Sequence, residues 1–349
     1  MKRWGKRLAA LLALAFLGMS VLNASWLAPA PRGYVKLIAQ RGTVQQAGGK
    51  PLFPVDCAAA RIEPPVHDYL ENTLPGLSQA ARLGAQAIAI DITPTADGQL
   101  VLLRDEALDC RTDGKGAVRK ATLAQLKALD AGHGYTADGG RTFPLRGSGR
   151  GAIPTLAEAL ALLPEKPLIL TLKGRDPREA ELLIAALDAA GREVEKIGDG
   201  FNAAEPVLAR LRQRYPQAWA FSPQGVKACT RDYLLRGWLG LTPDSCRNGT
   251  LFVPLNRQWA FAGWPNRTIA RMQAVGARIV ITGAQDDGQP QGLDLPEQLG
   301  KVPAGFNGYL WVDDIYTIGP ALRPAYNRRR PPEEEALAKA LEARRAARD

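Results

Sequence analysis

From residue 35 onward, short apolar runs alternate with segments in which apolar residues recur every three or four positions. The short runs predict buried strands, and the periodic segments predict helices that bury one face. The predicted strands are 35–39, 87–92, 100–103, 168–172, 193–197, 219–221, 251–253, 278–282 and 308–312. The predicted helices are 74–83, 122–129, 155–163, 178–189, 203–214, 226–236 and 267–275. This alternation is typical of the α/β class and of a parallel TIM (β/α)8 barrel.

Local signals agree with several of these boundaries. Thr122 and Thr155 precede predicted helices, and Glu158 follows Thr155 by three residues, which is the spacing of a capping box. Gly84 is expected to end the helix that begins at residue 74. Ala96-Asp97-Gly98 predicts a tight turn between two strands, since Asp-Gly tolerates positive φ angles.

The N-terminus has the pattern of an export signal. Lys2, Arg3, Lys6 and Arg7 precede an uninterrupted weakly polar to apolar run from 8 to 22. Residues 23–27 extend this run towards the ~20 residues of a marginal membrane span. Ala28-Pro29-Ala30 resembles a cleavage site, but we expect Pro31 to block processing. Residues 1–30 are therefore a signal peptide or, the alternative we favour, an uncleaved membrane anchor with its basic end in the cytoplasm.

The rest of the chain is then expected on the periplasmic side, anchored in the inner membrane. We expect a barrel over residues 31–327 and a charged tail over 328–349, which from Pro331 on is a solvated helix or disordered. The net charge of +10 includes four cations in the first seven residues. No stripe of Lys and Arg interleaved with aromatic residues follows, so we expect no nucleic-acid partner.

Four cysteines fit an exported protein. Cys57, Cys110, Cys229 and Cys246 form no CxxC motif and have no histidine at zinc-ligand spacing. Two disulfides are expected in an oxidising compartment, and Cys229–Cys246, which closes a short loop, is the pairing we favour. Four free thiols remain the alternative.

Chemistry in such barrels lies at the carboxyl ends of the strands, where this chain carries a series of short motifs. In chain order they are Gln40-Arg41-Gly42, Glu71-Asn72-Thr73, Ile88-Ala89-Ile90-Asp91, Thr95-Ala96-Asp97-Gly98, Arg104-Asp105, Arg111-Thr112-Asp113-Gly114-Lys115-Gly116 and Ile153-Pro154-Thr155-Leu156. Together, and in this order, they resemble the glycerophosphodiester phosphodiesterase family. The family pattern is His-Arg-Gly, ENT, I-E-x-D, T-x-D-G, His-Asp, R-T-x-G-x-G and I-P-T-L, so the resemblance implies a phosphodiesterase-type TIM barrel.

The resemblance also implies a set of site residues. In the family, carboxylates hold a divalent cation, two histidines exchange protons, and an Arg and a Lys bind the phosphate. Arg41 and Lys173 match the phosphate-binding positions, and Asp91 matches one metal ligand. The remaining positions are replaced: Gln40 and Arg104 stand where the histidines are expected, and Ala89 and Thr171 stand where the other two carboxylates are expected.

These replacements predict impaired catalysis. Glutamine cannot take up a proton at neutral pH, and an arginine is permanently protonated. One remaining carboxylate is a poor site for a hard cation, so no cofactor is expected. We therefore expect a protein that binds a phosphate-bearing ligand, such as a glycerophosphodiester or lipid headgroup, or a protein partner, through Arg41, Lys173 and Arg104.

Two other functions stay open. One is an active phosphoric diester hydrolase of lipid metabolism with an altered mechanism, which would need Ca²⁺ or Mg²⁺ and a relocated base. The other is a structural or interaction protein whose pocket is filled.

Several nearby residues have both a functional and a structural interpretation. Glu71, Asn72 and Asp105 are pocket candidates, although Glu71-Asn72-Thr73 could instead cap the following helix and Asp105 a turn. Asp91 could pair with Arg41 or Lys173. The two histidines, His67 and His133, are expected in surface or capping roles.

Overall fold

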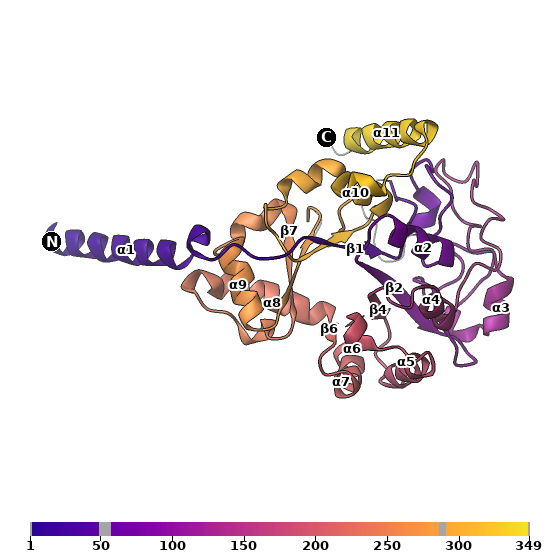
Figure 1. Ribbon diagram of the computed structural model, residues 1–349, viewed down its shortest axis with the longest axis horizontal. Coiled ribbons are helices and arrows are strands. Elements are labelled where there is room, and N and C mark those ends of the chain that lie inside the picture. The colour runs from indigo at the N-terminus through magenta and orange to yellow at the C-terminus, as the bar shows by residue number, and fades with distance from the viewer. Residues whose placement is uncertain (1, 49–56, 286–290, 348–349) are drawn as a thin grey trace. The chain divides into compact units, whose positions relative to one another are not determined.

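The computed structural model describes residues 2–48, 57–285 and 291–347 (Figure 1). The chain divides into two compact units, which are described separately. Unit 1 comprises Met1–Lys36, Phe221–Gln291 and Gly300–Leu310, and unit 2 comprises Leu37–Ala220, Gly292–Leu299 and Trp311–Asp349.

Unit 2 is built on parallel strands. The strands β1 (Lys36–Gln40), β2 (Ala87–Pro94), β4 (Leu168–Leu172) and β5 (Gly200–Asn202) pair in the order β5-β4-β2-β1, with β6 (Trp219–Phe221) next to β5. The short strand β3 (Leu100–Leu102) pairs antiparallel with β2 through the predicted Asp97-Gly98 turn. Seven of the eight residues of β2 are buried, as expected for a strand covered on both faces.

Unit 2 also contains helices, most of which lie between these strands along the chain. They are α2 (Leu74–Arg82), α3 (Leu123–Ala128), α4 (Leu156–Leu162), α5 (Arg178–Ala189), α6 (Val194–Ile197), α7 (Glu205–Arg214), α10 (Ile315–Leu322) and α11 (Pro331–Ala346). The predicted caps are confirmed, because the Thr122 and Thr155 side chains accept from the backbone three residues on and both form capping boxes.

One predicted strand is wrong. Residues 193–197 form the single helical turn α6, and β5 begins only at Gly200. The apolar residues Val194 and Ile197 are three apart, which suits a helical turn as well as a short strand. Gly198 then ends that turn in the left-handed conformation (φ 90°), where a Cβ would be disfavoured.

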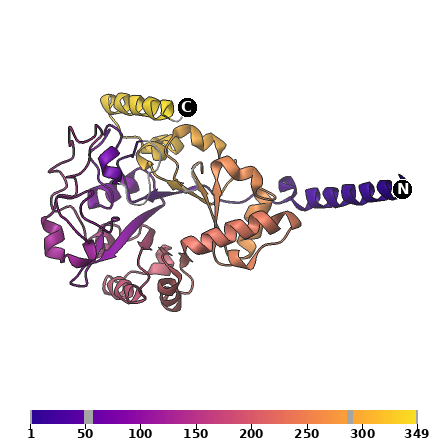
Figure 2. The same cartoon turned by 180° about the vertical axis from the view of Figure 1, so that it is seen from behind.

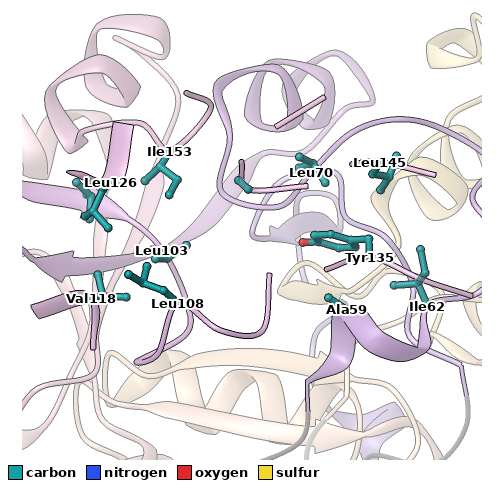
Figure 3. Close-up of a cluster of buried hydrophobic side chains, with 12 residues drawn as sticks. Ala59, Ile62, Leu70, Leu103, Leu108, Val118, Leu126, Tyr135, Leu145 and Ile153 are labelled. Atoms are coloured by element: carbon teal, nitrogen blue, oxygen red, sulfur yellow. The ribbon is translucent and has the colours of Figure 1, made fainter. Parts of the chain in front are cut away.

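A cluster of buried hydrophobic side chains lies in unit 2 (Figure 3). It contains Ala59, Ile62, Leu70, Val101, Leu103, Leu108, Val118, Leu126, Ala131, Tyr135, Leu145 and Ile153. Two members directly precede candidate site residues: Leu70 precedes Glu71, and Leu103 precedes Arg104. Burial of these side chains therefore fixes the backbone from which the site residues project.

The tail of the chain is a helix, one of the two alternatives predicted, but one face of it is buried. Leu337, Leu341 and Arg344 of α11 are buried. The Arg344 guanidinium pairs with Glu63 at 2.8 Å and with Asp314 at 2.9 Å. These ion pairs hold α11 against the rest of unit 2, so α11 is not a fully solvated helix.

Unit 1 contains the parallel strands β7 (Thr250–Pro254) and β8 (Arg278–Thr282) and the first two residues of β9 (Tyr309–Val312), which pair in that order. Its longer helices are α1 (Lys2–Leu22), α8 (Pro223–Arg236) and α9 (Asn266–Ala274). Figures 1 and 2 show α1 projecting away from α8 and α9, with its C-terminal end against them. Within the described residues, no helix combines the length and apolar character required to cross a membrane, so the predicted membrane-spanning anchor finds no support.

Both expected disulfides are present. Cys229 pairs with Cys246 within unit 1, and Cys57 pairs with Cys110 within unit 2. Neither bond is expected in a reducing cytoplasm, so the pair indicates an oxidising, extracytoplasmic compartment.

Candidate functional site

The backbone after β1 is held in an unusual conformation. Arg41 and Asn72 both adopt left-handed φ angles, 61° and 53°. The Arg41 N–H donates to the Ala89 carbonyl at 2.7 Å, and the Asn72 N–H donates to the Arg41 carbonyl at 2.9 Å. At Gly42 (φ 83°), a Cβ would lie 2.9 Å from the backbone of Gly76, so the chain can turn here only with glycine. These contacts fix the directions of the Arg41 and Asn72 side chains.

Two arginines share one glutamate at this turn. Glu71 Oε2 lies 2.8 Å from Arg41 Nη1 and 3.3 Å from Arg111 Nη1. Burial alone would raise the pKa of Glu71, but Arg111, Arg41 and Arg104 lower it to about 2. Arg111 also binds Asp105 Oδ2 through Nε at 2.6 Å and donates to the Tyr135 hydroxyl at 3.0 Å. Glu71, Asp105 and Arg111 therefore form a buried ion-pair network rather than helix or turn caps.

The segment Glu71-Asn72-Thr73 therefore has both of the roles considered for it, a helix cap and contacts within the site. Thr73 caps α2 by accepting from the Gly76 N–H, as the structural interpretation predicts. The Asn72 side chain instead donates to Asp91 Oδ2 at 3.2 Å and accepts from the Asp91 N–H at 3.1 Å. In the described part of the chain, Asp91 forms no ion pair with Arg41 or Lys173.

Arg104 and Lys173 are two further cations of this region, and neither belongs to the ion-pair network. Neither side chain forms an ion pair with a carboxylate in the described ranges, and the Lys173 ammonium donates to the main-chain carbonyl of Arg104. The nearby charge of Arg41, together with burial, lowers the pKa of Arg104. Desolvation of the ammonium group lowers the pKa of Lys173, with a contribution from Arg104. Such crowding of unpaired positive charge favours an anion.

Asp313, directly after β9, is a further acidic group near these cations. Its Oδ2 accepts from the Gly292 N–H at 2.7 Å, whereas its Oδ1 is buried without a hydrogen-bond partner. Burial raises the pKa of Asp313 to about 6, despite the opposing charges of Arg41 and Arg104. Its carboxyl group can therefore change charge near neutral pH.

The positions that the resemblance assigns to a metal lie together but do not supply metal ligands. In the sheet register Gln40 is opposite Ala89, and Asp91 is opposite Thr171. The methyl side chain of Ala89 and the neutral hydroxyl of Thr171 leave Asp91 as the one carboxylate of this set. In the ranges described, no three His, Cys, Asp or Glu residues are grouped so as to hold a metal ion. The residues present do not fit the divalent cation of the family.

The two histidines have other contacts. His67 is half-buried: its ring packs against Tyr316 at 4.7 Å between centroids, and burial lowers its pKa. Gln45 Nε2 lies 3.1 Å from its Nδ1 atom. His133 is half-buried in its loop, where its carbonyl accepts from Arg146.

Three residues of this region had no assigned role in the sequence analysis: Arg111, Tyr135 and Asp313. Arg111 is the first residue of the motif over 111–116, so its motif was visible although its contacts were not. Asp313 follows the last predicted strand, and the rule that site residues lie at strand ends could have found it. Tyr135 gives no signal in the sequence, because its hydroxyl accepts from Arg111, which lies 24 residues earlier in the chain.

Comparison with known proteins identifies relatives for part of the chain. Residues 65–198 match the glycerophosphoryl diester phosphodiesterase family. A glycerophosphodiester phosphodiesterase of Caldanaerobacter subterraneus is 34% identical over 137 residues, which is 38% of this chain and 53% of that protein. Human glycerophosphodiester phosphodiesterase 1 is 40% identical over 97 residues, 27% of each chain. The chain thus spans about half the length of the first relative.

Solved structures match over more of the chain. A glycerophosphodiester phosphodiesterase from Agrobacterium tumefaciens aligns with a TM-score of 0.54 and 19% identity, over 82% of this chain and 99% of its own. An Oleispira antarctica phosphodiesterase in complex with the product sn-glycerol-3-phosphate aligns with a TM-score of 0.53 and 19% identity, over 86% and 99%. This likeness confirms the predicted α/β barrel with eight parallel strands. Residues 65–198 are thus similar to the glycerophosphoryl diester phosphodiesterase family, and the likeness in fold extends over most of the chain.

Proposed function

We propose that this protein binds a phosphate-bearing ligand, a glycerophosphodiester or lipid headgroup, and does not hydrolyse it at an enzymatic rate. The observation that carries the proposal is Arg104, a cation without a carboxylate partner in the described residues. Arg104 and the Lys173 ammonium would hold the phosphate oxygens by charge-assisted hydrogen bonds. Arg41, which the resemblance implies as a phosphate ligand, is already paired with Glu71 and would contribute its remaining N–H groups.

The loss of hydrolysis follows from the same residues. Gln40 and Arg104 cannot exchange protons at neutral pH, and Asp91 alone does not replace three metal-binding carboxylates. The glycerol phosphate bound to the Oleispira relative supports the ligand class, because that molecule combines a phosphate with a glycerol group. In this proposal residues 31–327 form the binding body, residues 328–349 are an accessory tail, and α1 directs export to the periplasmic side and holds the chain at the inner membrane.

An active hydrolase with a different mechanism is the second candidate. Asp313 favours it, since a buried carboxyl with a pKa of about 6 can act as a general acid or base near neutral pH. Such an enzyme would use Asp313 in place of a family histidine. It would also need an electrophile in place of the metal ion, a role open to Arg41 and Arg104, whose positive charges both act on Asp313.

Hydrolysis of glycerophosphocholine with Ca²⁺ or Mg²⁺ separates the two candidates. We expect the natural chain to turn over far more slowly than the ~1 s⁻¹ of a slow enzyme. The variant Gln40→His, Ala89→Glu, Arg104→His, Thr171→Glu restores the family residues and should gain metal-dependent activity. Near-ultraviolet circular dichroism and disulfide content confirm that this variant folds. Rapid hydrolysis by the natural chain that is lost in Asp313→Asn would establish the second candidate instead.

A further inference from the structure

An apolar patch lies on the loop that Cys229 and Cys246 close, within unit 1. The loop contains the end of α8 and the 3-10 turn Gly237–Leu239. Four of its large apolar side chains are strongly exposed: Leu235 (70%), Trp238 (45%), Leu239 (60%) and Leu241 (55%). Four exposed side chains of this size within seven residues mark an interaction surface rather than ordinary surface composition.

This patch is held rigidly. Arg271 donates to the Gly237 carbonyl at 3.1 Å and to the Leu22 carbonyl at 3.1 Å. Tyr233, fully buried beneath the turn, donates to the Ala262 carbonyl at 2.8 Å. The disulfide and these hydrogen bonds fix the backbone that carries the exposed apolar side chains. Binding through them costs little ordering entropy.

Basic residues flank the patch along the chain. The segment 227–247 carries four basic residues and two acidic ones, a net charge of +2 (4 − 2). The basic side chains are exposed: Lys227, Arg231, Arg236 and Arg247. Both acidic residues are already paired, Asp232 with Arg231 and Asp244 with Arg247. Arg236, next to the patch, has no ion pair in the described part of unit 1.

The patch continues onto the end of α1. Asn23 donates to the Trp238 carbonyl at 2.8 Å, and Gly240 lies beside the Leu22 side chain. Trp26 and Leu27, in the turn that follows α1, are also exposed, at 80% and 45%. The apolar surface thus joins two segments that are more than 200 residues apart in the sequence.

We propose that the patch of Leu235, Trp238, Leu239 and Leu241 is a docking surface for an anionic lipid bilayer. Tryptophan suits the headgroup level, because its ring is apolar and its N–H is polar. Leucine side chains enter the acyl boundary, and flanking arginines bind anionic headgroups. A second copy of the chain fits less well, since a two-fold interface at this patch would bring the same cations together.

The surface does not depend on the phosphate site of unit 2. All four of its side chains lie in residues 229–246, outside the N-terminal segment. It therefore assigns the protein a membrane contact that differs from an N-terminal span.

Co-sedimentation of the full chain with vesicles tests this proposal. To remove the contribution of α1, every protein carries Leu11→Lys and Leu14→Lys, which place charges on exposed positions of that helix. In this background we expect binding to phosphatidylcholine vesicles with about 30% phosphatidylglycerol and weaker binding without it. Replacing Trp238, Leu239 and Leu241 by alanine should reduce the affinity roughly tenfold or more.

Trp259→Ala is the matched control, since Trp259 is a 79% exposed tryptophan of the same unit outside the disulfide-closed loop. It should leave the affinity unchanged. Free-thiol titration and near-ultraviolet circular dichroism check that each variant folds. Unchanged vesicle binding in the triple variant overturns the proposal. The proposal is also overturned if the parent chain binds no vesicles but forms a dimer in light scattering, and the triple variant abolishes that dimer.

Discussion

Arg192 and Arg104 are two arginines of unit 2 with opposite surroundings. The Arg192 side chain is 3% exposed and makes two 2.8 Å hydrogen bonds to Asp199. Its remaining N–H groups donate to the carbonyls of Leu163, Pro164 and Lys166 at 2.6–2.7 Å. Arg104 has no ion pair in the described residues, although Arg41 lies close enough to lower its pKa.

The contrast separates a structural arginine from a binding arginine. A buried guanidinium that serves only the fold gathers partners until its five donors are used. A guanidinium kept beside other cations without a carboxylate retains donors for a ligand. Arg111 shows the intermediate case, because Glu71, Asp105 and Tyr135 satisfy it while it positions Glu71 beside Arg41.

The largest expected effect is on stability. Arg192→Met leaves the Asp199 carboxylate buried without its cation, which typically costs about 3–5 kcal/mol. Arg104→Met should change the free energy of unfolding by less than about 0.5 kcal/mol, since no ion pair is broken. Urea unfolding measures both. Equal destabilisation by the two substitutions would contradict the assignment of a structural role to Arg192 and a binding role to Arg104.

The next effect is on ligand affinity. Arg104→Met removes a charge-assisted contact worth about 1.5–3 kcal/mol, so glycerophosphocholine should bind roughly 10- to 150-fold more weakly. Isothermal titration calorimetry gives the affinity. Arg82→Met, which removes an exposed arginine from α2, is the matched control and should bind as the natural chain does. A loss of affinity in both variants would point to general charge rather than to a site.

The smallest effect is on the pH dependence of binding. Asp313, with a pKa of about 6, is ionised above pH 6 and neutral below it. Protonation removes one negative charge near Arg41 and Arg104, so anion affinity should rise roughly threefold as the pH falls from about 7.5 to 5. Sulfate is the probe, because its charge is constant over this range. In Asp313→Asn the affinity should be independent of pH, and a pH dependence that persists there would exclude Asp313 as its origin.

The sequence predicts most of the barrel and the composition of the site, because both follow from local patterns. Strands 168–172, 219–221 and 278–282 were predicted with the bounds observed. The pairings within the site were not predictable, since they join distant segments. Asp91, for example, binds Asn72 and not the cations considered for it. The exposed patch of unit 1 is not predictable for the same reason. Helical periodicity predicts α8, but which of its apolar side chains are exposed depends on segments that are distant in the sequence.

Phosphorus-31 NMR of glycerophosphocholine mixed with the natural chain and Ca²⁺ tests the central claim most directly, because it reports binding and hydrolysis together. The account predicts that the diester resonance broadens or shifts in the natural chain and less so in Arg104→Met. It predicts no growing monoester resonance on the timescale of turnover. A diester resonance unaffected by the protein, or a monoester formed at ~1 s⁻¹ or faster, would contradict a protein that binds the phosphodiester without cleaving it.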